Sequence, residues 1–127
     1  MNKKEKIKHA KAMKDYFQTS GGRFQLLKSN SRRRGVEINI SRDEFINWFE
    51  KQQKVCYYCS TILVTGKGVR KINSLTIERL DNSKGYCIDN IVLACTRCNK
   101  IKNNDLTESD MLEIGEIIKR RRLIDTK

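Results

Sequence analysis

Two short stretches, Cys56-Tyr-Tyr-Cys59 and Cys95-Thr-Arg-Cys98, decide how this chain folds. Each is a C-x2-C turn, which brings two thiolates to one side of a tight loop, and 35 residues separate the two turns. Two such turns supply the four ligands of a closed tetrahedral site, so we predict that they hold one structural Zn²⁺ ion. An iron–sulfur cluster or a redox pair is the alternative use of the same cysteines.

The fifth cysteine, Cys87, lies outside both turns, and we expect it to be a half-buried small apolar side chain. The lysine-rich N-terminus lacks the apolar stretch of an export signal, so we expect a cytoplasmic protein without disulfides. No apolar run reaches the ~18 residues that a transmembrane helix needs, so we expect no membrane-spanning segment.

The composition is strongly basic, with 27 Lys and Arg against 15 Asp and Glu residues and a formal net charge of +12. Such a chain attracts polyanions, and nucleic acid is the leading partner because phosphate neutralisation supplies most non-specific affinity; an anionic membrane surface is the rival. Eleven basic and only two acidic residues fall within residues 1–35. We expect the following side chains to contact DNA phosphates: Lys3, Lys4, Lys6, Lys8, Lys11, Lys14, Arg23, Arg32, Arg33, Arg34, Lys67, Arg70, Lys71 and Lys102.

Apolar residues recur at helical spacing in the N-terminal third of the chain. They predict a helix over 3–19, which Gly21-Gly22 ends, and a second helix over 23–34. Ser41 followed three residues later by Glu44 is the signature of a capping box, which predicts that a third helix begins there.

The region around the cysteine turns reads as short strands and helices. The pattern predicts strands over 61–64, 75–80 and 91–94, a short helix over 99–102, and a last helix capped by Thr107 and Asp110. In such a ββα unit Glu78 would face Asn99, and a carboxylate oxygen with an amide oxygen is a sensible partial shell for Mg²⁺. We therefore predict an α+β fold with a small zinc-stapled core and flanking helices.

Three motifs in this region together resemble a known family: C-Y-Y-C, L-T-I-E-R-L-D-N-S-K-G-Y, and D-N-I-V-L-A-C-x-x-C-N-x-x-K. They are similar to the HNH, or ββα-metal, nucleases with a four-cysteine zinc site, found in phages and bacteria. The resemblance covers roughly residues 45–105, and residues 23–50 resemble the basic helical lead-in of small phage members.

This resemblance implies a Mg²⁺-type divalent-metal-dependent DNA endonuclease that nicks or cuts both strands. It divides the chain into a basic helical DNA-binding extension, 1–40, and a zinc-bound HNH domain with a C-terminal helix, 41–127. For a phage-encoded protein the location would be the bacterial host cytoplasm. The resemblance leaves room for a protein partner that directs the cut.

The resemblance also implies roles for individual residues. Glu78 stands at the first metal ligand, Asn99 at the last letter of the family name, and Asn90 at the asparagine that braces the catalytic loop. Arg79 stands where the general-base histidine is usual; it stays protonated and suits holding a phosphate instead. Asp81, two residues further along the predicted strand and on the same face, is the candidate base, with a nearby tyrosine or a metal-bound hydroxide as alternatives.

The missing histidine supports a second hypothesis from another class of protein. The only histidine, His9, lies far away in the predicted basic helix. The chain would then be a zinc-stabilised DNA-binding protein without hydrolytic activity. An RNA-directed enzyme is a third interpretation, because a basic surface does not choose between the two polymers.

Overall fold

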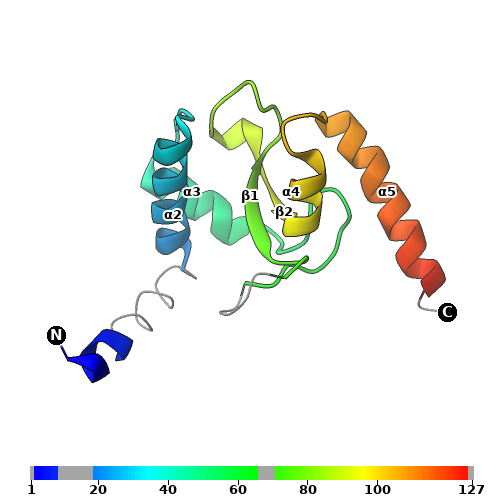
Figure 1. Ribbon diagram of the computed structural model, residues 1–127. Coiled ribbons are helices and arrows are strands. Elements are labelled where there is room, and N and C mark those ends of the chain that lie inside the picture. Colours follow the sequence, from blue (N-terminus) through cyan, green and yellow to red (C-terminus); the bar gives the residue numbers. More distant parts are fainter. Residues whose placement is uncertain (1, 9–18, 66–70, 126–127) are drawn as a thin grey trace.

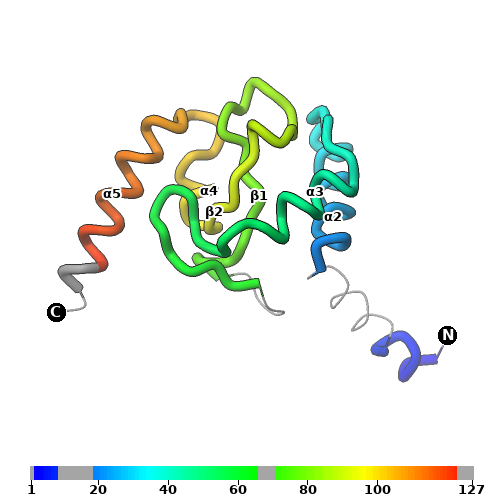
Figure 2. Tube along the Cα trace, turned by 180° about the vertical axis from the view of Figure 1, so that it is seen from behind, coloured from blue at the N-terminus to red at the C-terminus, as the bar shows by residue number. Residues whose placement is uncertain are grey.

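The computed structural model describes residues 2–8, 19–65 and 71–125, with side chains up to residue 122. A two-stranded sheet lies between two pairs of helices, with α2 and α3 on one side and α4 and α5 on the other (Figure 1, Figure 2). This arrangement confirms the predicted α+β class. The elements are α2 (Ser20–Arg34), α3 (Arg42–Lys51), β1 (Leu75–Arg79), the 3-10 turn η1 (Ile88–Asn90), β2 (Ile91–Cys95), α4 (Thr96–Lys102) and α5 (Glu108–Asp125).

The strands β1 and β2 form an antiparallel hairpin in which Leu75 lies opposite Cys95. Side chains alternate between the two faces of a strand, so Thr76 and Glu78 point to the same face. Both contact α4, because Asn99 hydrogen-bonds to Thr76 and Lys102 pairs with Glu78. The face of the hairpin that carries Glu78 is therefore the face that α4 covers.

Aromatic packing joins α2 to α3. Phe24 of α2 lies 5.4 Å from Phe45 of α3, and Phe45 lies 5.7 Å from Phe49, measured between ring centroids. These rings belong to the same buried cluster as the four cysteines and Met111 of α5. One core thus runs through the described part of the chain, and α2 is built into it.

The helix α2 begins earlier than the sequence predicted. Thr19 caps it with an extended backbone and a side chain that accepts a hydrogen bond from the Gly22 amide at 3.0 Å. Gly21 and Gly22 therefore lie within the helix, and the prediction that they separate two helices is wrong. Residues 3–8 are helical, as predicted. Positions 9–18 of the helix predicted over 3–19 lie outside the described residues, and Thr19 is the extended cap of α2.

Two other helix starts were predicted correctly, since Ser41 and Glu44 form the capping box of α3 and Thr107 and Asp110 cap each other's amides at the start of α5. The predicted strand over 61–64 is wrong, because this segment makes only isolated bridges.

The helix α4 begins at Thr96 rather than at the predicted position 99. The reason is the second cysteine turn itself. The Cys95 sulfur accepts a hydrogen bond from the Cys98 amide at 3.4 Å and so caps the helix.

Three contacts attach α5 to the first cysteine turn. Tyr57 donates a 2.6 Å hydrogen bond to Glu108, and Arg122 donates to the Cys59 carbonyl. Between them, Gly115 approaches the Tyr58 carbonyl so closely that a Cβ atom would overlap with it. The helix therefore braces the loop that carries two of the four sulfur atoms.

Candidate active site

The four cysteines of the two C-x2-C turns converge in the core. Their sulfur atoms lie within 4.8 Å of one another, and all four side chains are buried. Two come from the loop after α3 and two from the junction of β2 with α4, so the cluster joins both halves of the fold. Four buried thiols at this separation, with no disulfide among the described residues, fit a closed tetrahedral metal site such as that of zinc.

Glu78 lies beside this cluster and is only 5% exposed. Its Oε2 atom accepts a 2.6 Å hydrogen bond from the Tyr58 hydroxyl, and its Oε1 atom lies 3.5 Å from the Lys102 ammonium. Burial raises the pKa of the Glu78 carboxyl, and the interactions with Tyr58 and Lys102 partly offset that rise. The carboxylate is thus held between the first cysteine turn and the helix that follows the second.

Asn99 lies one turn of α4 before Lys102, on the same face of the helix. Its amide nitrogen donates to the Thr76 hydroxyl at 3.1 Å. Asn99 and Glu78 both line a cavity of about 190 Å³, which we call the Glu78 cavity. The structure therefore brings together the two residues that the sequence predicted to share an ion.

Arg79 also lines the Glu78 cavity. Its Nη1 atom donates to the carbonyls of Asn82 and Lys84 at 3.0 and 2.9 Å, and its guanidinium lies 5.4 Å from the ring centroid of Tyr86. These contacts fix the guanidinium against the turn that follows β1. Arginine has five N–H donors, so others stay available to a phosphate.

Asn90 braces the same turn. Its side-chain oxygen accepts from the Asp81 amide at 2.9 Å, and its nitrogen donates to the carbonyls of Asp81 and Gly85 at 3.1 and 2.9 Å. The side chain is buried and is not part of the lining of the Glu78 cavity. These three hydrogen bonds hold the turn in place, and the catalytic role that the resemblance implied for Asn90 stays a prediction.

Asp81 does not lie where the sequence predicted. Because β1 ends at Arg79, Asp81 is in the turn and shares no strand face with Arg79. Its carboxylate accepts from the amide and the hydroxyl of Ser83 at 2.9 and 2.6 Å, and these hydrogen bonds lower its pKa, which makes it a weaker base.

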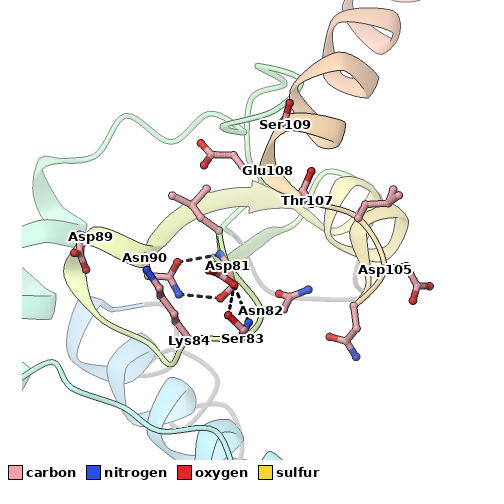
Figure 3. Close-up of a pocket in the computed structure, with 13 residues that line it drawn as sticks. Asp81, Asn82, Ser83, Lys84, Asp89, Asn90, Asp105, Thr107, Glu108 and Ser109 are labelled. Carbon is pink, nitrogen blue, oxygen red and sulfur yellow. Dashed lines mark hydrogen bonds between the residues drawn. The ribbon is translucent and has the colours of Figure 1, made fainter.

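The side chain of Asp81 lines a second hollow of about 630 Å³, which we call the acidic hollow (Figure 3). Three further carboxylates line it: Asp89, Asp105 and Glu108. The acidic hollow is larger than the Glu78 cavity, yet neither Glu78 nor Asn99 belongs to its lining. The candidate active site is therefore identified by its lining residues and not by the volume of the hollow.

The predicted phosphate contacts fall into four groups. Lys102 is fully buried and donates to the Arg79 carbonyl and the Asn82 side chain, so its placement corrects the expectation of a surface residue. Arg23 is half-buried. Lys11, Lys14, Lys67 and Arg70 lie outside the described residues, and the exposed members are Lys3, Lys4, Lys6, Lys8, Arg32, Arg33, Arg34 and Lys71.

Two residues that contact Glu78 were not predicted in that role: Lys102, which was expected to contact DNA phosphates, and Tyr58. The sequence contained an indication for Lys102, because a residue three positions after Asn99 on a helix lies on the same face. It contained no indication for Tyr58, since only the fold brings the Tyr58 hydroxyl to a carboxylate 20 residues further along the chain.

No protein-family model matches the chain. An uncharacterized protein of Acanthamoeba polyphaga mimivirus is 34% identical over 88 residues, which is 69% of this chain, and the chain spans 15% of that protein's length. Among solved structures, the rare-cutting HNH restriction endonuclease PacI is similar, with a TM-score of 0.65 and 26% identity over 77% of this chain and 75% of that one.

The fold and the buried cysteine cluster support an HNH nuclease of the zinc type, as the resemblance in the sequence implied. PacI, one of the proteins to which the chain is similar, is described as exhibiting a mechanism of DNA perturbation. In the described residues, no helix combines the length and the apolar composition required to cross a bilayer.

Proposed function

We propose that this protein is a divalent-metal-dependent DNA endonuclease that hydrolyses phosphodiester bonds. One observation carries the proposal: in an HNH-type fold, Glu78 and Asn99 share a cavity whose other charged lining residues are Arg34, Arg79 and Lys100. A buried carboxylate and an amide suit a hard cation, and the surrounding positive charges suit a phosphate.

The donor set fits Mg²⁺ or a similar ion. The Asn99 nitrogen is engaged by Thr76, which leaves the Asn99 oxygen for a cation. Lys102 keeps two other acceptors, so Glu78 can turn towards an ion without leaving the ammonium unpaired. An ion held by Glu78 and Asn99 would polarise the scissile phosphate and steady the leaving oxygen.

The side chains around this pair have roles that follow from their chemistry. Arg79 would hold the phosphate and stabilise the negative charge that develops on it. Asn90 keeps the turn below Arg79 in place. Neither Asp81, which lies in the acidic hollow, nor Tyr58, whose pKa burial raises far above the usual range, suits the role of general base.

The direct test is nicking of supercoiled plasmid with Mg²⁺ or Mn²⁺, and with EDTA as the metal-free control. Glu78→Gln should abolish nicking while zinc content and the far-ultraviolet circular dichroism spectrum stay unchanged. Glu116→Gln, an exposed carboxylate on α5, is the matched control and should cut like the wild type. Equal nicking by Glu78→Gln and the wild type would remove Glu78 from the mechanism.

A specific observation supports a second candidate, a zinc-stabilised DNA-binding protein without hydrolytic activity. Arg79 occupies the usual position of the base, and Asp81 lies outside the Glu78 cavity. Plasmid that is retarded but uncut under every metal condition would favour this candidate. A panel of labelled DNA and RNA substrates would decide between the polymers.

A further inference from the structure

Three hollows adjoin one another on the side of the molecule that carries Glu78. The Glu78 cavity shares Arg34, Tyr86 and Asn99 with a groove of about 260 Å³ along α2, which we call the α2 groove. It also shares Lys100 with a hollow of about 300 Å³ on the other flank of α4, the Lys100 hollow. Together they form a path that leads from α2, past Glu78, to the loop before β1.

The charged residues along this path are almost all basic. Glu78 is the only carboxylate in the three linings, and it is buried. The basic residues are Arg23, Arg33, Arg34, Arg79, Lys100, Lys71 and Arg97. A concave surface of one charge sign raises the local concentration of the opposite ion, here a polyanion.

Two of these arginines have groups to offer a ligand. The exposed guanidinium of Arg34 makes no hydrogen bond or ion pair within the described part of the chain. Arg33 donates to Asn30 through Nη2 and is otherwise exposed. The path therefore carries donors that the fold itself does not use.

The opposite side of the turn has the reverse charge. The acidic hollow contains four carboxylates and a single basic residue, Lys84, and both Asn82 and Asn104 line it as well as the Glu78 cavity. The turn at 81–85 is thus a border between a basic and an acidic surface. A polyanion that reaches Glu78 is attracted on one side of this border and repelled on the other.

We propose that duplex DNA lies along the basic path with a defined polarity of contacts. One backbone phosphate lies at the Glu78 cavity. Arg33 and Arg34 hold the phosphates that follow it along the α2 groove, and Lys100 and Lys71 hold the phosphates in the opposite direction, along the Lys100 hollow. The footprint ends at the turn 81–85. The placement of a DNA phosphate at Glu78 rests on the proposed function. The placement of the duplex along the basic path rests on charge and concerns binding alone.

The test measures binding without cleavage. A fluorescein-labelled duplex of random sequence is titrated without added Mg²⁺ or Mn²⁺, so that the structural zinc stays in place, and anisotropy is followed from 50 to 200 mM salt. Each lost phosphate contact lowers the slope of log K against log salt by about 0.9, so Arg33→Gln/Arg34→Gln should lower it by about 1.8 and weaken binding on the order of tenfold to a hundredfold at 0.1 M salt.

The matched control is Arg120→Gln/Arg121→Gln, which removes the same charge from exposed positions on α5, away from the path. It should change the slope and the affinity far less. Equal losses in the two double variants would overturn the proposal, since net charge alone would then explain binding. Zinc content and circular dichroism confirm that both variants fold.

A second arm separates this inference from the proposed function. Wild-type protein that binds the duplex with the predicted dependence on Arg33 and Arg34, but does not nick plasmid, would refute the endonuclease and leave the path intact. Wild-type protein that nicks, with both double variants binding alike, would refute the path and leave the endonuclease intact.

Discussion

The Tyr58 hydroxyl donates a 2.6 Å hydrogen bond to Glu78, and this contact ties the cysteine cluster directly to the candidate catalytic carboxylate. Tyr58 lies inside the first C-x2-C turn, and its carbonyl also meets Gly115 of α5. The cysteine cluster therefore does more than stabilise the fold at a distance. The position of the first cysteine turn determines which donor contacts Glu78 in the candidate active site.

Removal of that hydroxyl should separate positioning from metal binding. Tyr58→Phe keeps the buried ring but takes away the donor from a buried carboxylate, so we expect a loss of about 1–3 kcal/mol in the free energy of unfolding. Nicking should fall, with zinc content unchanged. The control is Tyr57→Phe, whose hydroxyl donates to Glu108 in a solvent-exposed hydrogen bond, and urea unfolding should show a change below about 0.5 kcal/mol for it.

The cysteine cluster should bind one zinc ion per chain, measured by inductively coupled plasma mass spectrometry. Cys95→Ser should lose the ion and most of the fold, because the four ligands join the two halves of the core. Cys87→Ser should keep both, since Cys87 lies outside the cluster and its thiol donates to Asp89, a contact that a serine hydroxyl can also make. Full zinc content in Cys95→Ser would contradict the assignment.

Lys102 should be needed for stability as well as for the site. Lys102→Met leaves Glu78 as a buried carboxylate without its cation, and breaking such a pair costs about 3–5 kcal/mol. The double variant Lys102→Met/Glu78→Gln should recover part of that loss. Lys100→Met, on an exposed position of the same helix, is the control. Equal stability of the two lysine variants in urea would show that the pair contributes nothing.

Ionisation of Glu78 should oppose folding when no divalent ion is added. Burial raises the pKa of this carboxyl above its ordinary value of 4.5, so the folded state holds the proton more tightly than the unfolded state does. Stability therefore falls as the pH rises from 4.5 through the folded-state pKa. The free energy of unfolding of the wild type should decline over that window relative to Glu78→Gln. Parallel pH profiles would contradict this.

Much of the candidate site was predictable from the order of residues. The spacing of Cys56, Cys59, Cys95 and Cys98 required two turns to meet, and a hairpin between them had to bring Glu78 near Asn99. The helix caps at Ser41 and Thr107 were also predictable, because a cap depends on residues only three positions apart. Features of this kind are either local in the sequence or follow from the meeting of the two cysteine turns.

Other features depended on where neighbouring elements came to lie. The end of β1 at Arg79 placed Asp81 on the acidic side of the turn, and no pattern in the sequence indicated that ending. Lys102 was expected on the surface because lysine is seldom buried without a partner, and its partners come from β1 and the turn.

The sequence by itself determined the four sulfur ligands, the ββα unit between them and the basic character of the chain. Only the tertiary structure decided which side chains hold Glu78 and which side of the turn attracts a polyanion. The physical reason is range. Ligand spacing and capping act over a few residues, whereas the burial of a carboxylate and the charge of a groove are sums over elements distant in the chain.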